Sequence, residues 1–283
     1  MVIEMSYKII LDSCGELPEK YKKDTRFELV PLGLEVGEYR IQDDEKFNQA
    51  EFLKKVAEYP GCPKSSCPSP ERFLQSYCCD ADNIYVVTLS ANLSGSYNSA
   101  ELAKKLYEEQ YGAKNICIID SCSASCGESQ IAFEAMRLEE EGLSFEEIEE
   151  KLKAFRDAMN TYFILDNLET LRKNGRLNGV KALVATTLNI KPVMGATMEG
   201  TILQLGQAIG MKKGLQKMSE MLAKEVKNSE EKCLMITHCN AKERAELFRD
   251  MVLERIQVKD VLIMDTAGIS SMYANDGGVI ATI

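Results

Sequence analysis

The chain has 283 residues with 45% hydrophobic and 28% charged side chains, which are the proportions of a globular protein and not of a disordered one. A formal net charge of −10 without any long Lys/Arg run argues against nucleic-acid binding, because phosphate groups repel a negative surface. The first residues lack a basic leader with a cleavage site, and no apolar stretch approaches the roughly 20 residues that cross a bilayer, so we expect a soluble, cytoplasmic protein.

The first half of the chain alternates expected strands with expected helices, a pattern that favours a parallel sheet with right-handed crossovers. Three of the strands end alike, in Asp12-Ser13, Leu89-Ser90 and Asp120-Ser121. Ligands of such sheets bind beyond the carboxyl ends of the strands. We therefore expect the three serine-bearing ends to meet at one rim and to form a binding site.

The pattern is less regular between the first and second of these strands. Extended segments are expected at 27–32 and 34–39, and a helix follows that ends before Pro60-Gly61. Residues 62–70 (CPKSSCPSP) are too rich in Pro and Ser for the interior of a helix, so we expect a rigid loop there and a short helix over 71–78.

The stretch 84–106 carries the clearest signal for a binding site. A β-branched apolar run predicts a buried strand, a turn of small residues follows, and apolar residues at helical spacing predict a helix. Ser94, Gly95 and Ser96 lie where this helix leaves its first N–H groups unpaired, so this end can hold a phosphate, sulfate or carboxylate. The alternative is that Ser94 only caps the helix, which is the commoner role of an isolated serine there.

The second half of the chain favours an α+β arrangement. We expect a strand at 161–165, a short helix at 167–173 that stops at Asn174-Gly175, and a helix from Leu177 to Asn189 that leads into an edge strand at 190–193. Further strands are expected at 200–204, 233–237, 261–265 and 279–283, and further helices at 213–227 and 241–255. The chain is therefore predicted to be an α/β protein of two domains: residues 1–156 with a parallel sheet, and residues 157–283 with an α+β fold.

The ten cysteines show none of the paired C-x-x-C spacing of structural zinc sites. Several lie in or beside expected strands, where a free cysteine behaves as a small hydrophobic residue. We expect reduced thiols, no metal site and no cofactor.

Two enzymatic interpretations remain as alternatives. A serine hydrolase would need a base for Ser94, but the only histidine, His238, ends an apolar strand and nothing in the sequence brings it to that serine. A phosphoryl-transfer enzyme could use Asp12 as its nucleophile, but Cys14 stands where such enzymes carry a second acid. Neither a P-loop nor a G-x-G-x-x-G motif is present.

The remaining groups are hydroxyls and amides, which can hold an anionic head group but have no means of breaking a bond. If the ligand also has an apolar tail, a tunnel between the two domains could bury it, each methylene contributing about 0.8 kcal/mol. A long-chain carboxylate meets both requirements.

Six motifs, in the same order, resemble those of DegV-family fatty-acid-binding proteins. They are Asp12-Ser13-x-x-Glu16-Leu17-Pro18, Pro63-Lys64-Ser65-Ser66-x-Pro68-Ser69, Leu93-Ser94-Gly95-Ser96-Tyr97-x-Ser99-Ala100, Asp120-Ser121, Leu171-x-x-Asn174-Gly175-Arg176-Leu177 and Asn189-Ile190-Lys191-Pro192. Each motif is weak by itself, but six in register over nearly the whole chain indicate the family.

The resemblance implies a two-domain α/β protein that encloses one long-chain fatty acid and is not an enzyme. It places the carboxylate on the hydroxyls of Ser65 and Ser94, with Ser66 nearby. The backbone amides of Gly95 and Ser96 would add two further donors.

A kinase partner is also implied. In bacteria that have a fatty acid kinase, such proteins present the bound acid to a separate kinase subunit that phosphorylates the carboxylate, and transient contact with a membrane is compatible with this role. Arg172, Lys173 and Arg176 would suit docking to that subunit. The alternative is that they form an ordinary basic helix end.

The chain departs from the family pattern at two places. Ile209-Gly210 stands where the family often has Arg-Gly, and residues 273–278 (YANDGG) stand where it usually has His followed by Gly-Pro-Gly. Asn275 can hydrogen-bond a carboxylate but brings no positive charge. The head group would then be held mainly by neutral donors, or the preferred ligand would differ.

Overall fold

A parallel four-stranded sheet forms the first part of the computed structural model, which describes residues 6–177 and 189–283. Its order is β2-β1-β6-β7, so the ends of β1, β6 and β7 lie side by side at one edge, as the sequence predicts. The strands are β1 Tyr7–Asp12, β2 Phe27–Val30, β6 Asn83–Thr88 and β7 Asn115–Asp120. The helices of this part are α1 Glu19–Lys22, α3 Pro70–Tyr77, α4 Ser96–Tyr111, α5 Cys126–Glu140 and α6 Phe145–Ala158.

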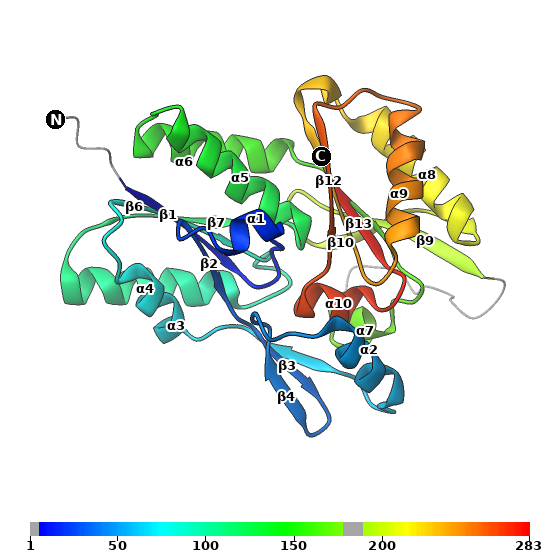
Figure 1. Cartoon of the computed structure of the whole chain (residues 1–283), viewed down its shortest axis with the longest axis horizontal. Helices are drawn as coiled ribbons and strands as arrows, with labels where there is room; N and C mark the ends of the chain where they lie inside the picture. Colours follow the sequence, from blue (N-terminus) through cyan, green and yellow to red (C-terminus); the bar gives the residue numbers. More distant parts are fainter. Residues whose placement is uncertain (1–5, 178–188) are drawn as a thin grey trace.

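Helices cover both faces of this sheet, which explains why its strands are continuous apolar runs. Successive strand residues point to opposite faces, so Ile9 and Leu11 pack with α5 and α6, whereas Ile10 packs with α3 and α4 (Figure 1). The buried residues in both layers fix the strand register and hold the carboxyl edge in place.

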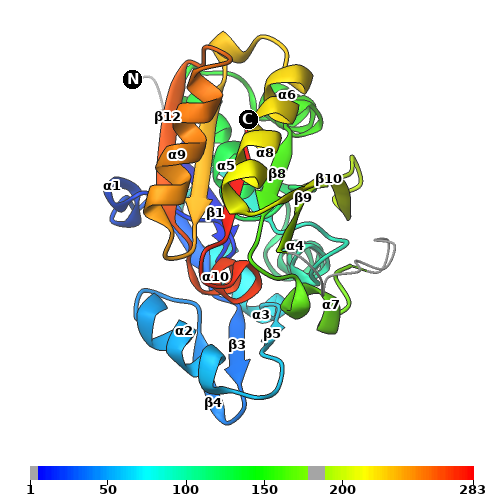
Figure 2. The same ribbon diagram turned by 90° about the vertical axis from the view of Figure 1, so that its right-hand side faces the viewer.

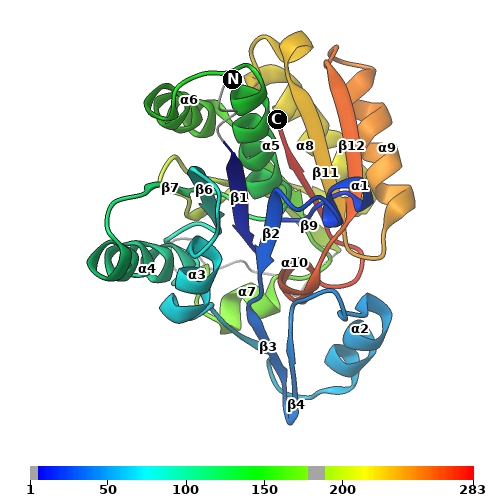
Figure 3. The same ribbon diagram turned by 60° about the vertical axis from the view of Figure 1, so that its left-hand side comes forward.

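A small lobe projects from one end of the molecule (Figures 2 and 3). It consists of an antiparallel sheet of order β4-β3-β5 and one helix, with β3 Gly33–Val36, β4 Tyr39–Gln42, α2 Gln49–Glu58 and β5 Lys64–Ser66. We call it the β3–β5 lobe, residues 33–66. The rigid loop expected at 62–70 is therefore partly wrong, because residues 64–66 pair with β3 and place Ser65 opposite Leu34.

A mixed six-stranded sheet of order β10-β9-β8-β13-β11-β12 forms the remaining part. Its strands are β8 Thr161–Ile164, β9 Ile190–Ala196, β10 Ile202–Ile209, β11 Cys233–His238, β12 Asp260–Asp265 and β13 Val279–Thr282. Its helices are α7 Glu169–Lys173, α8 Met211–Glu225, the 3-10 turn η1 Ser229–Glu231, α9 Lys242–Leu253 and α10 Gly268–Ala274. The helix expected from Leu177 to Asn189 lies almost entirely outside the described residues.

The outer face of this second sheet packs on α8 and α9, through residues such as Ile164, Val193 and Ile236. The neighbouring strand residues Phe163 and Met194 point to the opposite, inner face. The α/β fold with a parallel and a separate mixed sheet agrees with the prediction, whereas the boundary at 156/157, in the last turn of α6, stays a prediction. None of the helices within residues 6–177 and 189–283 combines the length and the apolar character needed to span a membrane.

Helix α5 joins the two sheets through a buried polar side chain. Gln130 of α5 donates from Nε2 to the carbonyl oxygens of Thr282 at 2.8 Å and Cys233 at 3.1 Å, which belong to β13 and β11. If Gln130 is replaced by an apolar residue, each carbonyl loses this hydrogen bond. Water does not fully replace it, because these groups are buried or half-buried.

We expect Gln130→Leu to lower the free energy of unfolding by about 1–3 kcal/mol, since it removes the hydrogen bonds that Gln130 donates to these carbonyls. Urea unfolding followed by circular dichroism measures the change. The control is Gln216→Leu on the exposed face of α8, where the expected change is below about 0.5 kcal/mol. Equal stabilities for the two variants would contradict the role given to Gln130.

Candidate functional site

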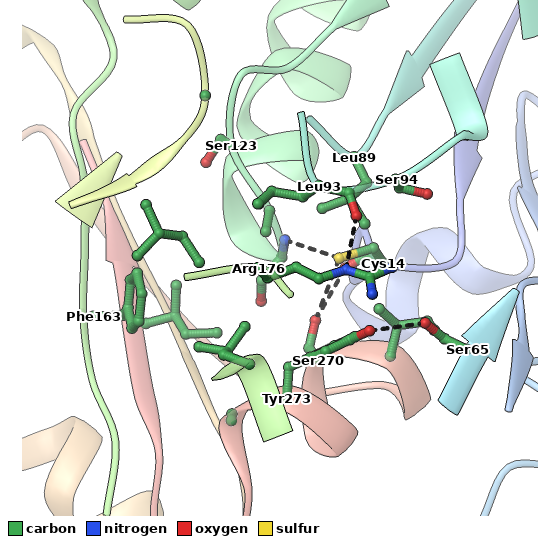
Figure 4. Close-up of a pocket in the computed structure, with 18 of the residues that line it drawn as sticks. Cys14, Ser65, Leu89, Leu93, Ser94, Ser123, Phe163, Arg176, Ser270 and Tyr273 are labelled. Carbon is green, nitrogen blue, oxygen red and sulfur yellow. Dashed lines mark hydrogen bonds between the residues drawn. The ribbon is translucent and has the colours of Figure 1, made fainter. Parts of the chain in front are cut away.

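A cavity of about 350 Å³ lies between the carboxyl edge of the first sheet and the inner face of the second, within the size range of small-molecule sites. Its wall is mainly apolar, and the hydroxyl groups of several serines and of Tyr273 lie among the apolar side chains (Figure 4). The apolar side chains that line it include Leu32, Leu89, Leu93, Ala124, Phe163, Leu165, Leu171, Ala196, Ile202, Ile269, Ala274 and Ile280. The polar ones are Cys14, Ser65, Ser66, Cys67, Ser94, Ser123, Ser125, Thr161, Arg176, Ser270 and Tyr273.

One end of the cavity gathers hydroxyls around a guanidinium group. Ser65 of β5 and Tyr273 of α10 have their hydroxyl oxygens 3.0 Å apart, and Ser94 lies in the turn before α4. Figure 4 shows the guanidinium of Arg176 between Ser94 on one side and the Ser65–Tyr273 pair on the other. We call Ser65, Ser94, Arg176 and Tyr273 the head-group end.

Arg176 is held in place by groups of this same end. Its Nε donates to the carbonyl oxygen of Leu93 at 3.2 Å, its Nη1 donates to that of Asn174, and its guanidinium lies 5.8 Å from the ring centre of Tyr273. Two of the five N–H donors of a guanidinium are thus used to orient it. The remaining N–H groups can bind an anion in the cavity.

Tyr273 keeps its proton at neutral pH. Burial raises the pKa of its phenol above the ordinary value of 10, although Ser65 and Arg176 act in the opposite direction. The phenol can therefore donate a hydrogen bond to an anionic group while it shares another with Ser65.

Four of the predicted binding residues line the cavity, namely Ser65, Ser66, Ser94 and Gly95. Ser96 lies behind them: it is fully buried, its hydroxyl oxygen is 3.1 Å from that of Ser94, and its backbone N–H donates to that oxygen at 3.2 Å. Ser94 therefore both contacts the cavity and binds an N–H of α4, so the two roles considered from the sequence are compatible.

Asn275 does not line the cavity. Its backbone has φ 57°, which ends α10, and its side chain donates to the carbonyl oxygen of Tyr273 at 3.1 Å and accepts from Thr170 at 3.3 Å. The residue two positions earlier, Tyr273, supplies the polar group instead. Sequence reasoning missed it because no helix was expected at 268–274, so the i, i+3 spacing of Ser270 and Tyr273 was not recognised.

The three residues predicted to dock a partner separate in the structure. Arg172 and Lys173 are exposed at the end of α7, where Arg172 pairs with Glu169 at 2.8 Å. Arg176 is half-buried and lines the cavity. Its position suits ligand binding better than docking.

The serines at the strand ends are close to the cavity, but their hydroxyls do not line it. Ser13 donates to Asp43 at 3.1 Å, Ser90 to the carbonyl of Gly200 at 2.8 Å, and Ser121 to that of Ser123 at 3.1 Å. The three strand ends lie side by side, as expected, but these three hydroxyls bond other segments of the fold.

The residues considered for catalysis also lie off the cavity wall. Asp12 is fully buried and accepts the backbone N–H groups of Leu89 at 2.9 Å and Cys14 at 3.1 Å. His238 is 4% exposed, its Nδ1 accepts the N–H of Ala241 at 3.3 Å, and burial lowers its pKa. None of the cavity-lining residues within the described ranges is a histidine or a carboxylic acid. Ser94 therefore has no base beside it there.

Thiols and acids do not form a metal centre in the part of the chain that the structure describes, where no cluster of three or more suitable side chains occurs. All ten cysteines are free.

A buried acid lies behind the cavity wall. Glu16 accepts the hydroxyl of Ser125 at 2.8 Å and the N–H of Ala267 at 3.3 Å, and Ser125 lines the cavity. Burial raises the pKa of Glu16 to about 7, and burial likewise raises that of Asp43 to about 6. At a pH between the ordinary and the raised pKa values, the folded protein therefore keeps protons on these two carboxyls that the unfolded chain releases.

Comparisons with known proteins agree with this architecture. The sequence model of the DegV family matches residues 6–281. A DegV domain-containing protein of Streptococcus gordonii is 36% identical over 279 residues, which cover 98% of each chain.

Two solved structures show the same fold with fatty acids bound. A DegV family protein from Ruminococcus gnavus, with vaccenic acid, has a TM-score of 0.97, 53% identity and 99% coverage of both chains. The Streptococcus pneumoniae Fatty Acid Kinase (Fak) B3 protein, loaded with linoleic acid, has a TM-score of 0.87 and 31% identity, with 98% of this chain and 99% of that chain covered.

The raised pKa of Glu16 predicts that stability falls as the pH rises. A carboxyl whose folded pKa is about 7 contributes stability that is complete below its unfolded pKa near 4.5 and is lost as the pH rises through 7. The loss from this one group is on the order of 3 kcal/mol. Urea unfolding at pH 5 and pH 8 should show it, and Glu16→Gln should flatten the difference, whereas Glu109→Gln on the exposed face of α4 should not. An unchanged pH dependence in Glu16→Gln would refute the assignment.

Proposed function

The chain belongs to the DegV family, and we propose that it binds one long-chain fatty acid, with the carboxylate at the head-group end and the acyl chain along the rest of the cavity. The observation that carries this proposal is the polarity of the cavity. Three hydroxyls and a guanidinium meet at one end, and the apolar wall extends from there toward Phe163 (Figure 4).

The head-group end matches a carboxylate in charge and in hydrogen bonding. The Ser65–Tyr273 pair uses one of its two O–H groups between the two hydroxyls, so the pair can donate one O–H to a carboxylate, and Ser94 can donate a second. Arg176 supplies a positive charge, which the departures from the family pattern had left unaccounted for. The amides at the start of α4 would add the partial positive charge of a helix N-terminus.

The acyl chain would supply most of the affinity. Ten buried methylenes contribute about 8 kcal/mol, whereas a hydrogen bond to a charged group contributes about 1.5–3 kcal/mol. The head-group end would therefore fix the orientation and the choice of a carboxylate, and the apolar wall would hold the ligand. The fatty acids in the Ruminococcus and Streptococcus proteins support this assignment.

Presentation of the acid to a kinase is the second part of the proposal. The relation to a Fatty Acid Kinase (Fak) B3 protein supports it, as does the position of two exposed basic residues, Arg172 and Lys173, only a few residues before Arg176. A kinase subunit that docked on this basic segment would lie beside the end of the cavity where the carboxylate binds.

Ser94→Ala should weaken the binding of oleic acid roughly tenfold, because one charge-assisted hydrogen bond is lost. Displacement of a fluorescent fatty acid measures the affinity, and denaturing mass spectrometry of the purified wild-type protein should release one equivalent of acid. Ser99→Ala, one turn further along α4 and off the cavity wall, is the matched control. A wild-type protein that neither carries nor binds a fatty acid would overturn the proposal, and so would a hydrolytic rate that Ser94→Ala abolishes.

Replacing both Arg172 and Lys173 by alanine should lower the rate at which a bacterial fatty acid kinase subunit phosphorylates the bound acid severalfold, without changing the affinity for oleic acid. Loss of the docking charges explains the lower rate. The control replaces Lys22 and Lys23, an exposed pair at the end of α1 in which Lys22 also bonds a glutamate three residues away. Equal rates for the two double variants would argue against docking at Arg172 and Lys173.

A further inference from the structure

A carboxylate of the β3–β5 lobe caps a helix of the second domain. Asp43, which is 3% exposed, accepts the backbone N–H of Gly268 at 2.7 Å through Oδ1 and that of Ile269 at 2.8 Å through Oδ2. These are the first two residues of α10. The N-terminus of this helix is therefore satisfied by a side chain that is more than 220 residues away in the sequence.

Helix α10 has no such cap of its own. Ala267, at its N-cap position, makes no side-chain cap hydrogen bond, and the helix has only seven residues. A helix of this length is unstable by itself. Gly268 is required by the arrangement, because a Cβ at this position would lie 2.5 Å from Oδ1 of Asp43.

The carboxylate of Asp43 is itself fixed from the side of the first sheet. The hydroxyl of Ser13, just after β1, donates to Oδ2 at 3.1 Å and accepts the N–H of Leu32 at 3.0 Å. Gln49 of α2 makes a second connection, with Nε2 donating to the carbonyl of Thr266 at 3.0 Å. The lobe, the first sheet and α10 thus meet at this one carboxylate. Figure 2 shows α10 next to the lobe.

Helix α10 carries part of the ligand site. Ser270 and Tyr273, one turn apart, line the cavity, and the hydroxyl of Tyr273 contacts Ser65 of the same lobe that provides Asp43. A shift of α10 would therefore separate Tyr273 from Ser65 and would open the head-group end.

We propose that Asp43 is a positioning residue for the ligand: by capping α10 from the β3–β5 lobe, it holds Tyr273 against Ser65 in the geometry that binds a carboxylate. This inference rests on the proposed function. Asp43 does not line the cavity, so its effect on the ligand is indirect, through the position of α10. An asparagine has nearly the same shape but offers one oxygen and an NH₂ group, so it can accept only one of the two N–H groups of the helix.

Asp43→Asn should weaken the binding of oleic acid by roughly tenfold, and it should speed hydrogen exchange at residues 268–274 in the ligand-free protein. Asp43→Ala should give the larger effect if it folds. The matched control is Ser144→Ala, which removes the capping box of α6, away from the cavity. This variant should lose stability to urea but keep the affinity of the wild-type protein.

A double-mutant cycle with Tyr273→Phe shows whether Asp43 acts through Tyr273. If it does, Asp43→Asn costs less than about threefold in the Tyr273→Phe background. A full tenfold loss in that background, or unchanged affinity in Asp43→Asn alone, overturns the role of Asp43 while leaving the proposed function intact. Failure of the wild-type protein to bind oleic acid overturns the proposed function itself.

Discussion

The head-group end depends on hydrogen bonds between segments that are far apart in the sequence. Its four side chains come from β5, the turn before α4, the segment after α7, and α10, and apolar packing alone would not fix their relative positions. Buried polar groups do so: Asp12 holds the start of the turn through Leu89, the carbonyl of Leu93 orients Arg176, and Asp43 holds α10. Such bonds are directional, and leaving one partner unpaired costs more than the bond contributes, so they select a single arrangement.

The dependence on hydrogen bonds between distant segments explains which parts of the structure could be predicted from the sequence. Local patterns were sufficient to predict the parallel sheet, because β-branched runs that alternate with helical patterns indicate strands without any information from distant parts of the chain. The turn with Ser94 and Gly95 was likewise identified from a strand, a small-residue segment and a helix that follow one another directly. The lining positions of Ser65 and Ser66 came from the family resemblance, and residues 64–66 were expected to be a loop rather than a strand.

Non-local information decided the rest. The α10 helix was not predicted because it is short and its cap is provided by Asp43, which no local pattern reveals. Arg176 was assigned to a docking surface from the family resemblance, whereas its direction toward the cavity depends on the carbonyl of Leu93, in another segment. The serines after the strands were expected in the site because of their position at the strand ends. That position does not reveal which group each hydroxyl bonds; Ser90, for example, bonds the carbonyl of Gly200 in the other domain.

The phenol of Tyr273 also affects how the head-group end responds to pH. Burial raises the pKa of the Tyr273 phenol above its ordinary value of 10, so this group keeps its O–H throughout the neutral range. The groups whose pKa values lie near neutrality, Glu16 and Asp43, are placed one layer behind, where they contact the backbone at the start of α10. Titration of these two groups would therefore change the support of the site and not the side chains that would touch the ligand.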